Sequence, residues 1–421
     1  MPVGRRARSI AIGVVAGAVS VLGSGGSAAA AEGQTPVGDV RRVVFVGNNW
    51  AGTADVLAPG TFEKLGTINI IPDREERMQE IASNPERLAY FLAIREAIGE
   101  GNDQYVDDMY SSNDGKLMIV SRPSFADVVG ISLETGEIKW RFPVSGHRSD
   151  HMAISPDGRE VVVSASTGNV VHVLRVSDGK ELGQFPSGGS PHENVYIDGG
   201  EKIIHASIGM VYTPLDQPPL DPTKGERVLQ IVDADTYEVL RRYDLRQALD
   251  ERGLEDYSTA VRPMTLSPNE QKIYFQVSFF HGFLEMDRSS GKIQRVKHLP
   301  NLVPDMPREQ YLLDSAHHGI AMNPEGTKIC VAGTMSDYAT VVDRRTYQRG
   351  KLLKKKDGKP YWVTPSWDGD YCYISWSGTD QVAKISYRTG RIVDTAKVGD
   401  HPQRVRNAFV EQSLVEGLPQ G

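Results

Sequence analysis

One phrase of strand-forming residues and tight turns recurs along this chain about every 40–45 residues. Its clearest copy, residues 147–179, reads HRSDHMAISPDGREVVVSASTGNVVHVLRVSDG. A polar entry leads into a short apolar run, a Ser-Pro-Asp-Gly turn, a β-branched run, a second turn and another strand. Strands separated by such turns predict a β-meander, and the period is typical of the blades of a β-propeller.

Six copies of the phrase are complete, and a fragment lies at each end of the mature chain. The complete copies begin near residues 105, 147, 190, 260, 315 and 361. Residues 401–410 match only the start of the phrase, and the strands expected within 41–71 match only the remainder. A blade shared by the two ends closes the ring and leaves no open sheet edge. We therefore predict an all-β fold, a seven-bladed β-propeller of four-stranded antiparallel blades closed by the N- and C-terminal strands.

Two segments interrupt the repeat. Residues 73–101 carry apolar side chains at helical spacing, with Asn84-Pro85 dividing two short helices. A Pro-rich loop covers about residues 212–226, and a short amphipathic helix is expected at 245–254. The helical insertion is expected to pack on the ring as a cap or to lie over the channel mouth as a lid, since insertions in repeat proteins gather on the binding face. Residues 32–421 are otherwise predicted to form a single domain.

The first 31 residues have the composition of a secretory signal peptide. Arg5, Arg6 and Arg8 precede an apolar stretch at 10–22, and an Ala-rich cleavage site precedes Glu32. The apolar stretch is too short and too rich in Gly and Ser to favour a membrane anchor. We expect a secreted or extracytoplasmic protein, exported by the general or the twin-arginine route, with no membrane association after cleavage.

The two cysteines, Cys330 and Cys372, occupy equivalent regions of neighbouring copies. Export permits a disulfide. Aligning the turns offsets the two positions by one residue, however, and side chains alternate along a strand. The offset points the two side chains to opposite faces, so two buried free thiols are predicted at least as readily as a bridge.

The phrases AISPDGREVVVSAS, AMNPEGTKICVAG and LSPNEQKIYFQVS resemble blades of seven-bladed propellers of the YVTN, or quinoprotein-amine-dehydrogenase-like, group. The resemblance covers roughly residues 40–410 and is specific for the fold rather than for one activity. The group includes lactonases, the virginiamycin B lyase, methylamine dehydrogenase heavy chains, nitrous oxide reductase and surface-layer proteins. The resemblance implies a lactonase-, lyase- or quinoprotein-like enzyme as one possibility, and no complete catalytic motif of a single member is present.

Histidines and carboxylates gather where each copy begins. In a propeller these entries line the mouth of the central channel, so side chains far apart in sequence meet there. Six of the ten histidines fall in the entries. The entry residues are Asp107, Asp108, His147, Asp150, His151, His192, Glu193, Arg262, His317, His318, Tyr361, Trp362, His401, Gln403 and Arg404.

This composition suits either a metal or acid–base chemistry. Neutral imidazoles with carboxylates bind zinc, copper or iron, and His also titrates near neutral pH. We predict His151, His192, His317 and His318 as ligands of a divalent metal. The predicted catalytic residues are His151, His192, Glu193, Asp108, Asp150, Arg262 and Arg404, with the two arginines holding a substrate anion.

The expected function is therefore an exported enzyme that acts on a small organic metabolite as hydrolase, lyase or oxidoreductase. The alternative is a non-catalytic propeller that binds a protein partner or a cell-wall glycan through its rim loops. Polar entries also occur simply because a propeller channel is wet, and Asp in this loop often caps amides of a neighbouring blade. The net charge of −7 lacks the basic footprint of a nucleic-acid-binding protein. No Gly-x-Gly-x-x-Gly opens a helix, so no nucleotide cofactor is expected.

Overall fold

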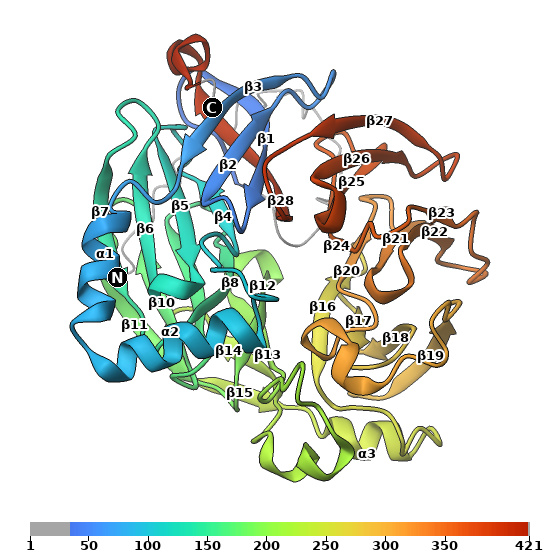
Figure 1. Ribbon diagram of the computed structural model, residues 1–421. Helices are drawn as coiled ribbons and strands as arrows, with labels where there is room; N and C mark the ends of the chain where they lie inside the picture. Colours follow the sequence, from blue (N-terminus) through green and yellow to red (C-terminus); the bar gives the residue numbers. More distant parts are fainter. Residues whose placement is uncertain (1–33, 420–421) are drawn as a thin grey trace, which may run out of the picture.

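Seven four-stranded antiparallel sheets stand around one central axis in the computed structural model (Figure 1). The structure describes residues 34–419, so the predicted signal peptide at 1–31 lies outside the described residues. In six sheets the strands follow in chain order from the axis outward. The first three are β4 (Met109–Ser111), β5 (Leu117–Arg122), β6 (Asp127–Ser132) and β7 (Ile138–Pro143); β8 (Ser149–Ile154), β9 (Glu160–Ala165), β10 (Val170–Arg175) and β11 (Glu181–Pro186); and β12 (Pro191–Ile197), β13 (Lys202–Ser207), β14 (Leu229–Asp233) and β15 (Val239–Arg242).

The next three sheets repeat this order. They are β16 (Val261–Leu266), β17 (Lys272–Val277), β18 (Gly282–Asp287) and β19 (Ile293–His298); β20 (Gly319–Met322), β21 (Lys328–Gly333), β22 (Tyr338–Asp343) and β23 (Leu353–Lys354); and β24 (Pro360–Pro365), β25 (Tyr371–Trp376), β26 (Gln381–Ser386) and β27 (Ile392–Lys397).

The seventh sheet combines the two ends of the described chain. Its order is β28 (Pro402–Glu411), β1 (Val40–Asn48), β2 (Thr53–Leu57) and β3 (Lys64–Asn69), so the C-terminal strand is the innermost one. β28 pairs antiparallel with β1 from Val40↔Glu411 to Asn48↔Pro402, and it packs against the inner strands β4 and β24 of both neighbouring blades. The predicted seven-bladed ring, closed by its terminal strands, is confirmed.

The repeated turn phrase has a common local structure. At 155–158 the Ser155 hydroxyl accepts hydrogen bonds from the backbone N–H groups of Arg159 and Glu160, at 3.2 and 3.0 Å. Gly158 takes a φ of +68°, a conformation that glycine adopts without steric cost. Ser112, Ser267 and Ser366 accept the equivalent hydrogen bond in other blades, each at 3.0 Å. The recurring phrase thus satisfies backbone donors that a tight turn leaves without ladder partners.

The core lies between the blades. Ile119 and Val128 of one sheet, for example, pack with Val161 and Val163 of the next in a single cluster of buried side chains. Alternate residues of each strand therefore face a neighbouring sheet on both sides, which is why the strands are rich in Val and Ile.

The helical insertion forms as predicted. α1 (Arg74–Ala82) and α2 (Pro85–Ala97) are divided at Asn84, whose side chain accepts from the backbone N–H groups of Glu86 and Arg87. The buried Arg122 of β5 ties the insertion to its blade through ion pairs with Asp73 and Asp127. The third predicted helix is α3 (Leu245–Asp250), shorter than expected, and the Pro-rich loop contains one 3₁₀ turn at Pro218–Thr223. Within residues 34–419, no helix has the length and apolar character needed to span a bilayer.

The two cysteines form a disulfide, one of the two outcomes that the sequence left open. Cys330 in β21 and Cys372 in β25 are bonded at an S–S distance of 2.05 Å and lie in one buried cluster. The one-residue offset does place them on opposite faces of their own sheets. Adjacent propeller blades stack face to face, however, so opposite faces of two neighbouring sheets point toward each other.

Candidate functional site

The predicted site residues lie on the innermost strands or directly before them. β8 carries Asp150 and His151, and β12 carries His192 and Glu193. Arg262 belongs to β16 and Arg404 to β28. Asp108 precedes β4, and His317 and His318 precede β20. The ring therefore brings residues from six blades to the same end of the channel.

A bulge recurs at this level in five inner strands. Between Ser149 and Met152 the inner strand advances three residues while its partner advances only two, from Ala165 to Val163. The same irregularity occurs at 191–194, 261–264, 360–363 and 402–405. Bulges re-aim side chains and recur beside functional sites. The bulged positions are Asp150 and His151, His192 and Glu193, Arg262 and Pro263, Tyr361 and Trp362, and Gln403 and Arg404.

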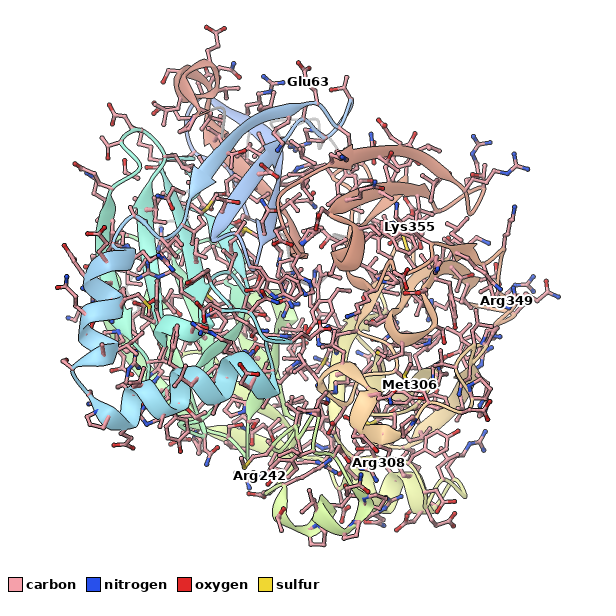
Figure 2. All side chains as sticks on the ribbon, viewed as in Figure 1. Glu63, Arg242, Met306, Arg308, Arg349 and Lys355 are labelled. Atoms are coloured by element: carbon pink, nitrogen blue, oxygen red, sulfur yellow. A yellow bond between two sulfur atoms is a disulfide. The ribbon has the colours of Figure 1, made fainter. Side chains whose placement is uncertain are left out.

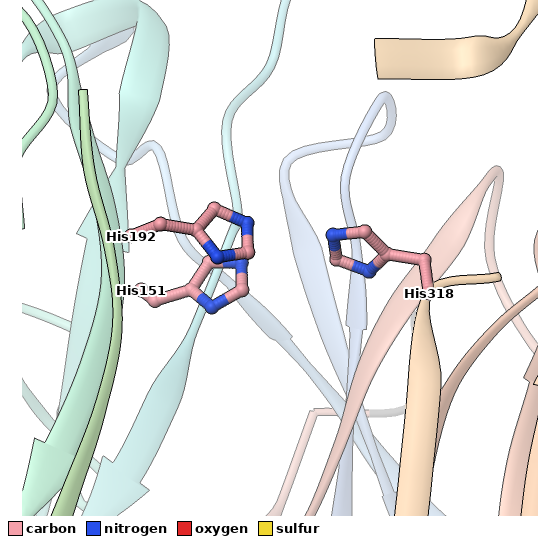
Figure 3. Close-up of side chains that lie close together, drawn as sticks. All are labelled: His151, His192 and His318. Atoms are coloured by element: carbon pink, nitrogen blue, oxygen red, sulfur yellow. The ribbon is translucent and has the colours of Figure 1, made fainter. Parts of the chain in front are cut away.

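Three buried histidines from three blades converge (Figure 3). One ring nitrogen each of His151, His192 and His318 lies within 4.8 Å of the others. The rings of His151 and His192 lie side by side with centroids 3.7 Å apart, and His318 faces them from the opposite wall at 5.7 and 5.5 Å. Two nitrogens on one tetrahedral zinc ion are about 3.4 Å apart, so movement of the rings toward one another would complete a three-histidine ligand set.

The protonation of these rings favours metal binding. Burial, followed by nearby cationic side chains, lowers the pKa of His151 and His318 well below the usual value, and burial with His318 and Arg262 does the same for His192. Neutral imidazole is the form that binds a metal. In addition, the Nδ1 atoms of His192 and His318 are buried without a hydrogen-bond partner among the described residues. A buried polar atom without a partner is costly, and a ligand would remove that cost.

Carboxyl groups surround the three rings. Glu193 Oε2 is hydrogen-bonded to His151 Nδ1 at 2.6 Å, and Asp150 Oδ1 lies 3.8 Å from His151 Nε2. Asp107, Asp150 and His151 form a second group with atoms within 4.8 Å. Burial raises the pKa of Glu193 to about 8 and that of Asp107 to about 7. The group can thus hold or release protons near neutral pH.

Two of the predicted site residues, Asp108 and Arg404, form hydrogen bonds and ion pairs within the wall of the channel. Asp108 accepts two hydrogen bonds from Arg406, at 2.9 and 2.8 Å, and one from the backbone N–H of Met152 in the next blade. Arg404 pairs with Asp107 at 3.3 Å, and its guanidinium stacks 3.9 Å from the ring centroid of Trp362. The structure therefore gives Asp108 and Arg404 partners of their own.

His317 lies apart from the three converging histidines. Its Nε2 is 3.3 Å from the Tyr338 hydroxyl, and its ring packs edge-on against His281. Its neighbour His318 instead stacks on Tyr361 at 4.0 Å. Adjacent residues of an extended chain point to opposite sides, which agrees with the two separate environments.

Arg262 differs from the other arginines of the site. Its Nε and Nη2 donate to the Ser278 hydroxyl at 3.0 and 2.9 Å, and Nη2 also donates to the Leu313 carbonyl. Among residues 34–419 no carboxylate forms an ion pair with it. Burial lowers the pKa of Arg262 to about 10.

Three insertions cover the site. A small cavity of about 20 Å³ is lined by Asp107, Asp150, His151, His192 and Arg262, among others. Apolar side chains close it from above: Ile98 follows α2, Val211 starts the Pro-rich loop, and Leu312 and Leu313 precede β20. We call these four side chains the roof. A second cavity of about 260 Å³, lined by Glu193, Trp362 and later residues of the inner strands, lies at the other end of the channel.

Sequence reasoning did not single out Arg148, which precedes β8 and forms a buried ion pair with Asp150. Arg148 belongs to the same entry, His-Arg-Ser-Asp-His, so its position two residues before Asp150 was visible in the sequence. Tyr361 was noted as an entry residue without a role, and its hydroxyl lies 3.4 Å from His318 Nε2.

No protein-family model and no curated protein matches this sequence. Among solved structures the chain is similar to the β-propeller domain of Cps50 (Swd1) from Myceliophteria thermophila. The two are 12% identical, the match covers 70% of this chain and 86% of that chain, and the TM-score is 0.49. The seven-bladed fold described above rests on the strand pairing itself.

Proposed function

We propose that this chain is an exported, metal-dependent β-propeller enzyme that acts on a small organic metabolite at its central channel. The observation that carries the proposal is the convergence of His151, His192 and His318, whose ring nitrogens lie within 4.8 Å of one another. Three imidazoles with room for a further ligand are typical of catalytic zinc sites, and imidazole also suits copper and iron.

The surroundings of the three rings support a metal. Glu193 holds the Nδ1 atom of His151 at 2.6 Å, and carboxylates orient metal-binding histidines in the same way in known metal sites. A bound divalent metal supplies a Lewis acid and lowers the pKa of a bound water. Asp107 and Asp150 place carboxyl groups beside the ligand set, where they can exchange protons with a substrate.

Three further parts of the proposal rest on other observations. The repeat phrases support membership of the YVTN, or quinoprotein-amine-dehydrogenase-like, group. The signal-like sequence at 1–31 supports export, and the Cys330–Cys372 disulfide fits an oxidising compartment. The reaction is proposed as hydrolysis, elimination or oxidation.

Metal loading tests the proposal directly. The purified protein is incubated with zinc, copper(II) or cobalt(II), desalted, and analysed by mass spectrometry for metal per chain. We expect close to one metal ion per chain, and for cobalt a visible absorption band of a low-coordinate site. His192→Ala and His318→Ala should each lower the metal content at least tenfold, since each removes one of three ligands.

His317→Asn is the matched control, because it changes the adjacent histidine outside the ligand set. It should keep the metal content of the wild type. Equal metal content in His192→Ala, His318→Ala and His317→Asn would refute the three-histidine site. If a metal binds, turnover of small lactones, esters and amines should depend on it and be lost in His192→Ala.

The alternative function, a propeller that binds a protein or glycan through its rim, is favoured by one observation. Met210 and Leu215 of the Pro-rich loop are 52% and 70% exposed, and exposed apolar side chains of this kind occur at interaction sites. If the protein binds a partner through its rim, Leu215→Ser should abolish that binding and His192→Ala should leave it unchanged. If the protein is an enzyme, His192→Ala should abolish turnover and Leu215→Ser should leave turnover unchanged.

A further inference from the structure

The cavity above the three histidines is lined by one cation, Arg262, that no carboxylate of residues 34–419 contacts directly. Arg148 pairs with Asp150, Arg404 with Asp107, and Arg406 with Asp108. Arg262 is 1% exposed, yet within the described residues its guanidinium reaches only a hydroxyl and a carbonyl oxygen. A buried charge is costly unless an opposite charge accompanies it. Asp314 and Asp150 act on the guanidinium only from a distance, and each is paired with another cation. Among the described residues, Arg262 therefore has no carboxylate acceptor in direct contact.

The present cavity is too small for an organic substrate. Its volume of about 20 Å³ holds roughly one water molecule or one ion. A metabolite of several heavy atoms can reach the histidines only if the roof moves. The part of the roof in contact with Arg262 is Leu313, whose carbonyl accepts from Nη2.

The segment that carries Leu313 is held in an unusual conformation. Leu313 and Asp314 have φ values of +49° and +60°, a region that non-glycine residues rarely adopt and that requires outside contacts to persist. We call residues 307–315 the strap. Its outer contacts run to the Pro-rich loop: Asp314 pairs with the buried Lys224 at 3.0 Å, and the Thr213 hydroxyl donates to the Tyr311 carbonyl at 2.6 Å.

The start of the strap is attached to the same loop. Figure 2 labels Arg308, in the lower part of the view. Its Nη2 atom lies 2.8 Å from Asp221 and 3.1 Å from Asp216. The strap is thus fixed to the Pro-rich loop on its outer side. On the side that faces the histidines, the strap contacts a charged side chain, Arg262, whose Nη2 donates to the Leu313 carbonyl.

We infer that Arg262 binds the carboxylate of a small monoanionic substrate, and that the Leu313 carbonyl occupies this position until the substrate displaces it and releases the strap. A carboxylate offers two charged acceptor oxygens to the guanidinium, so it competes well with one neutral carbonyl. The identification of this anion as the substrate rests on the proposed metal-dependent function; the anion subsite itself does not.

Acetate and its neutral isostere acetamide serve as probes. Calorimetric titrations use the full chain, both metal-free and zinc-loaded, with the wild type, Arg262→Gln and the control Arg241→Gln. Arg241 lies on the outer strand β15, over the ring of Tyr243. We expect acetate to bind the wild type and Arg241→Gln, at least tenfold weaker binding to Arg262→Gln, and no binding of acetamide.

Hydrogen exchange of the strap amides measures its release. Acetate should raise exchange in residues 307–315 at least threefold in the wild type, and Arg262→Gln should show raised exchange without acetate. Equal affinity for acetate and acetamide, or no effect of Arg262→Gln, would overturn the subsite; acetate binding with unchanged exchange would overturn the role of the strap.

Zinc content separates this inference from the proposed function. Arg262→Gln should keep the wild-type zinc content, which also shows that the variant is folded. If Arg262→Gln does not fold, the preference of the wild type for acetate over acetamide tests whether the ligand must be charged. Arg262→Lys, which keeps the positive charge, then tests whether acetate binds at this residue. Acetate binding to a protein that takes up no zinc would leave the subsite standing and refute the metal site.

Discussion

At the bulges of the inner strands, consecutive side chains leave the regular ladder and meet the channel. Asp150 and His151 both line the cavity at the histidine end. Glu193 and Trp362 line the cavity at the other end, while their neighbours His192 and Tyr361 line the first one. In two of the bulges the paired residues thus serve two levels of the channel, and in a third both residues face the same cavity; a regular strand with strict alternation would not allow this.

His401, which lies outside the proposed ligand set, allows a test of how the burial of one side chain affects the pH dependence of stability. This buried side chain stacks on Trp50 at 3.7 Å, its backbone N–H donates to Asp380, and its φ is +55°. Burial, with a smaller contribution from Lys359, lowers the pKa of His401 to about 3. The folded protein keeps this ring neutral, while the unfolded chain protonates it below about pH 6.5. Stability should therefore fall as the pH falls from about 6.5 toward about 3.

His401→Asn removes this titration and keeps a residue that tolerates positive φ. The variant should be less stable than the wild type at neutral pH because it loses the stacking on Trp50. Its free energy of unfolding should nevertheless decline less steeply in acid, by roughly 2–3 kcal/mol between about pH 6.5 and pH 4. Urea unfolding at several pH values measures the difference. Parallel pH profiles of the two proteins would contradict the prediction.

At the scale of elements, each blade behaves as a unit joined to its neighbours mainly by apolar side chains. One junction has a covalent addition, the Cys330–Cys372 bond between β21 and β25. The bonded residues are 42 positions apart in sequence. Cross-linking a loop of this length restricts the unfolded chain and stabilises the fold by about 4 kcal/mol in the chain-entropy description.

The double variant Cys330→Ala, Cys372→Ala should lose about 4 kcal/mol of unfolding free energy. It should keep the metal content of the wild type, because the disulfide lies on the second strands of its blades and away from the inner ones. Melting curves with and without dithiothreitol provide the check. Reductant should lower the melting temperature of the wild type and leave that of the variant unchanged; an equal effect on both would show that the bond is not formed.

For the whole molecule, the decisive junction is the pairing of β28 with β1. β1 is the second strand of its blade, and without β28 it would present an unpaired edge of buried residues such as Val44, Phe45 and Val46. Such an edge templates pairing with other chains. The ring also needs β28 to fill the space between β4 and β24.

A chain that ends at Asp400 should therefore aggregate instead of forming a monomeric propeller. A chain that ends at Glu411 is the control, since it keeps β28 and loses only the last packed residues, including Val415 and Leu418. The control should remain monodisperse with lower stability. Size-exclusion chromatography with light scattering distinguishes the two. A monodisperse, folded chain ending at Asp400 would show that ring closure does not depend on β28.

Much of this architecture was predictable from the sequence because each blade is a local structure. Turn residues such as Ser155 and Gly158 act on neighbours within a few positions, so the phrase specifies its meander wherever it occurs. The incomplete copies at the two ends predicted the shared blade, and Asn84-Pro85 correctly divided the two helices of the insertion. The sequence also placed His151, His192 and His318 at blade entries, which the ring then brought together.

The tertiary structure determined which side chains of different blades contact each other. The sequence could not show that His318 turns toward His151 while His317 turns toward His281. Nor could it show that a carboxylate contacts Arg404 while, within residues 34–419, none contacts Arg262. It also left the state of the two cysteines open, because facing positions on neighbouring sheets follow from the stacking of blades. Local backbone chemistry is encoded within a few residues, whereas the distance between side chains on different blades exists only once the ring has closed.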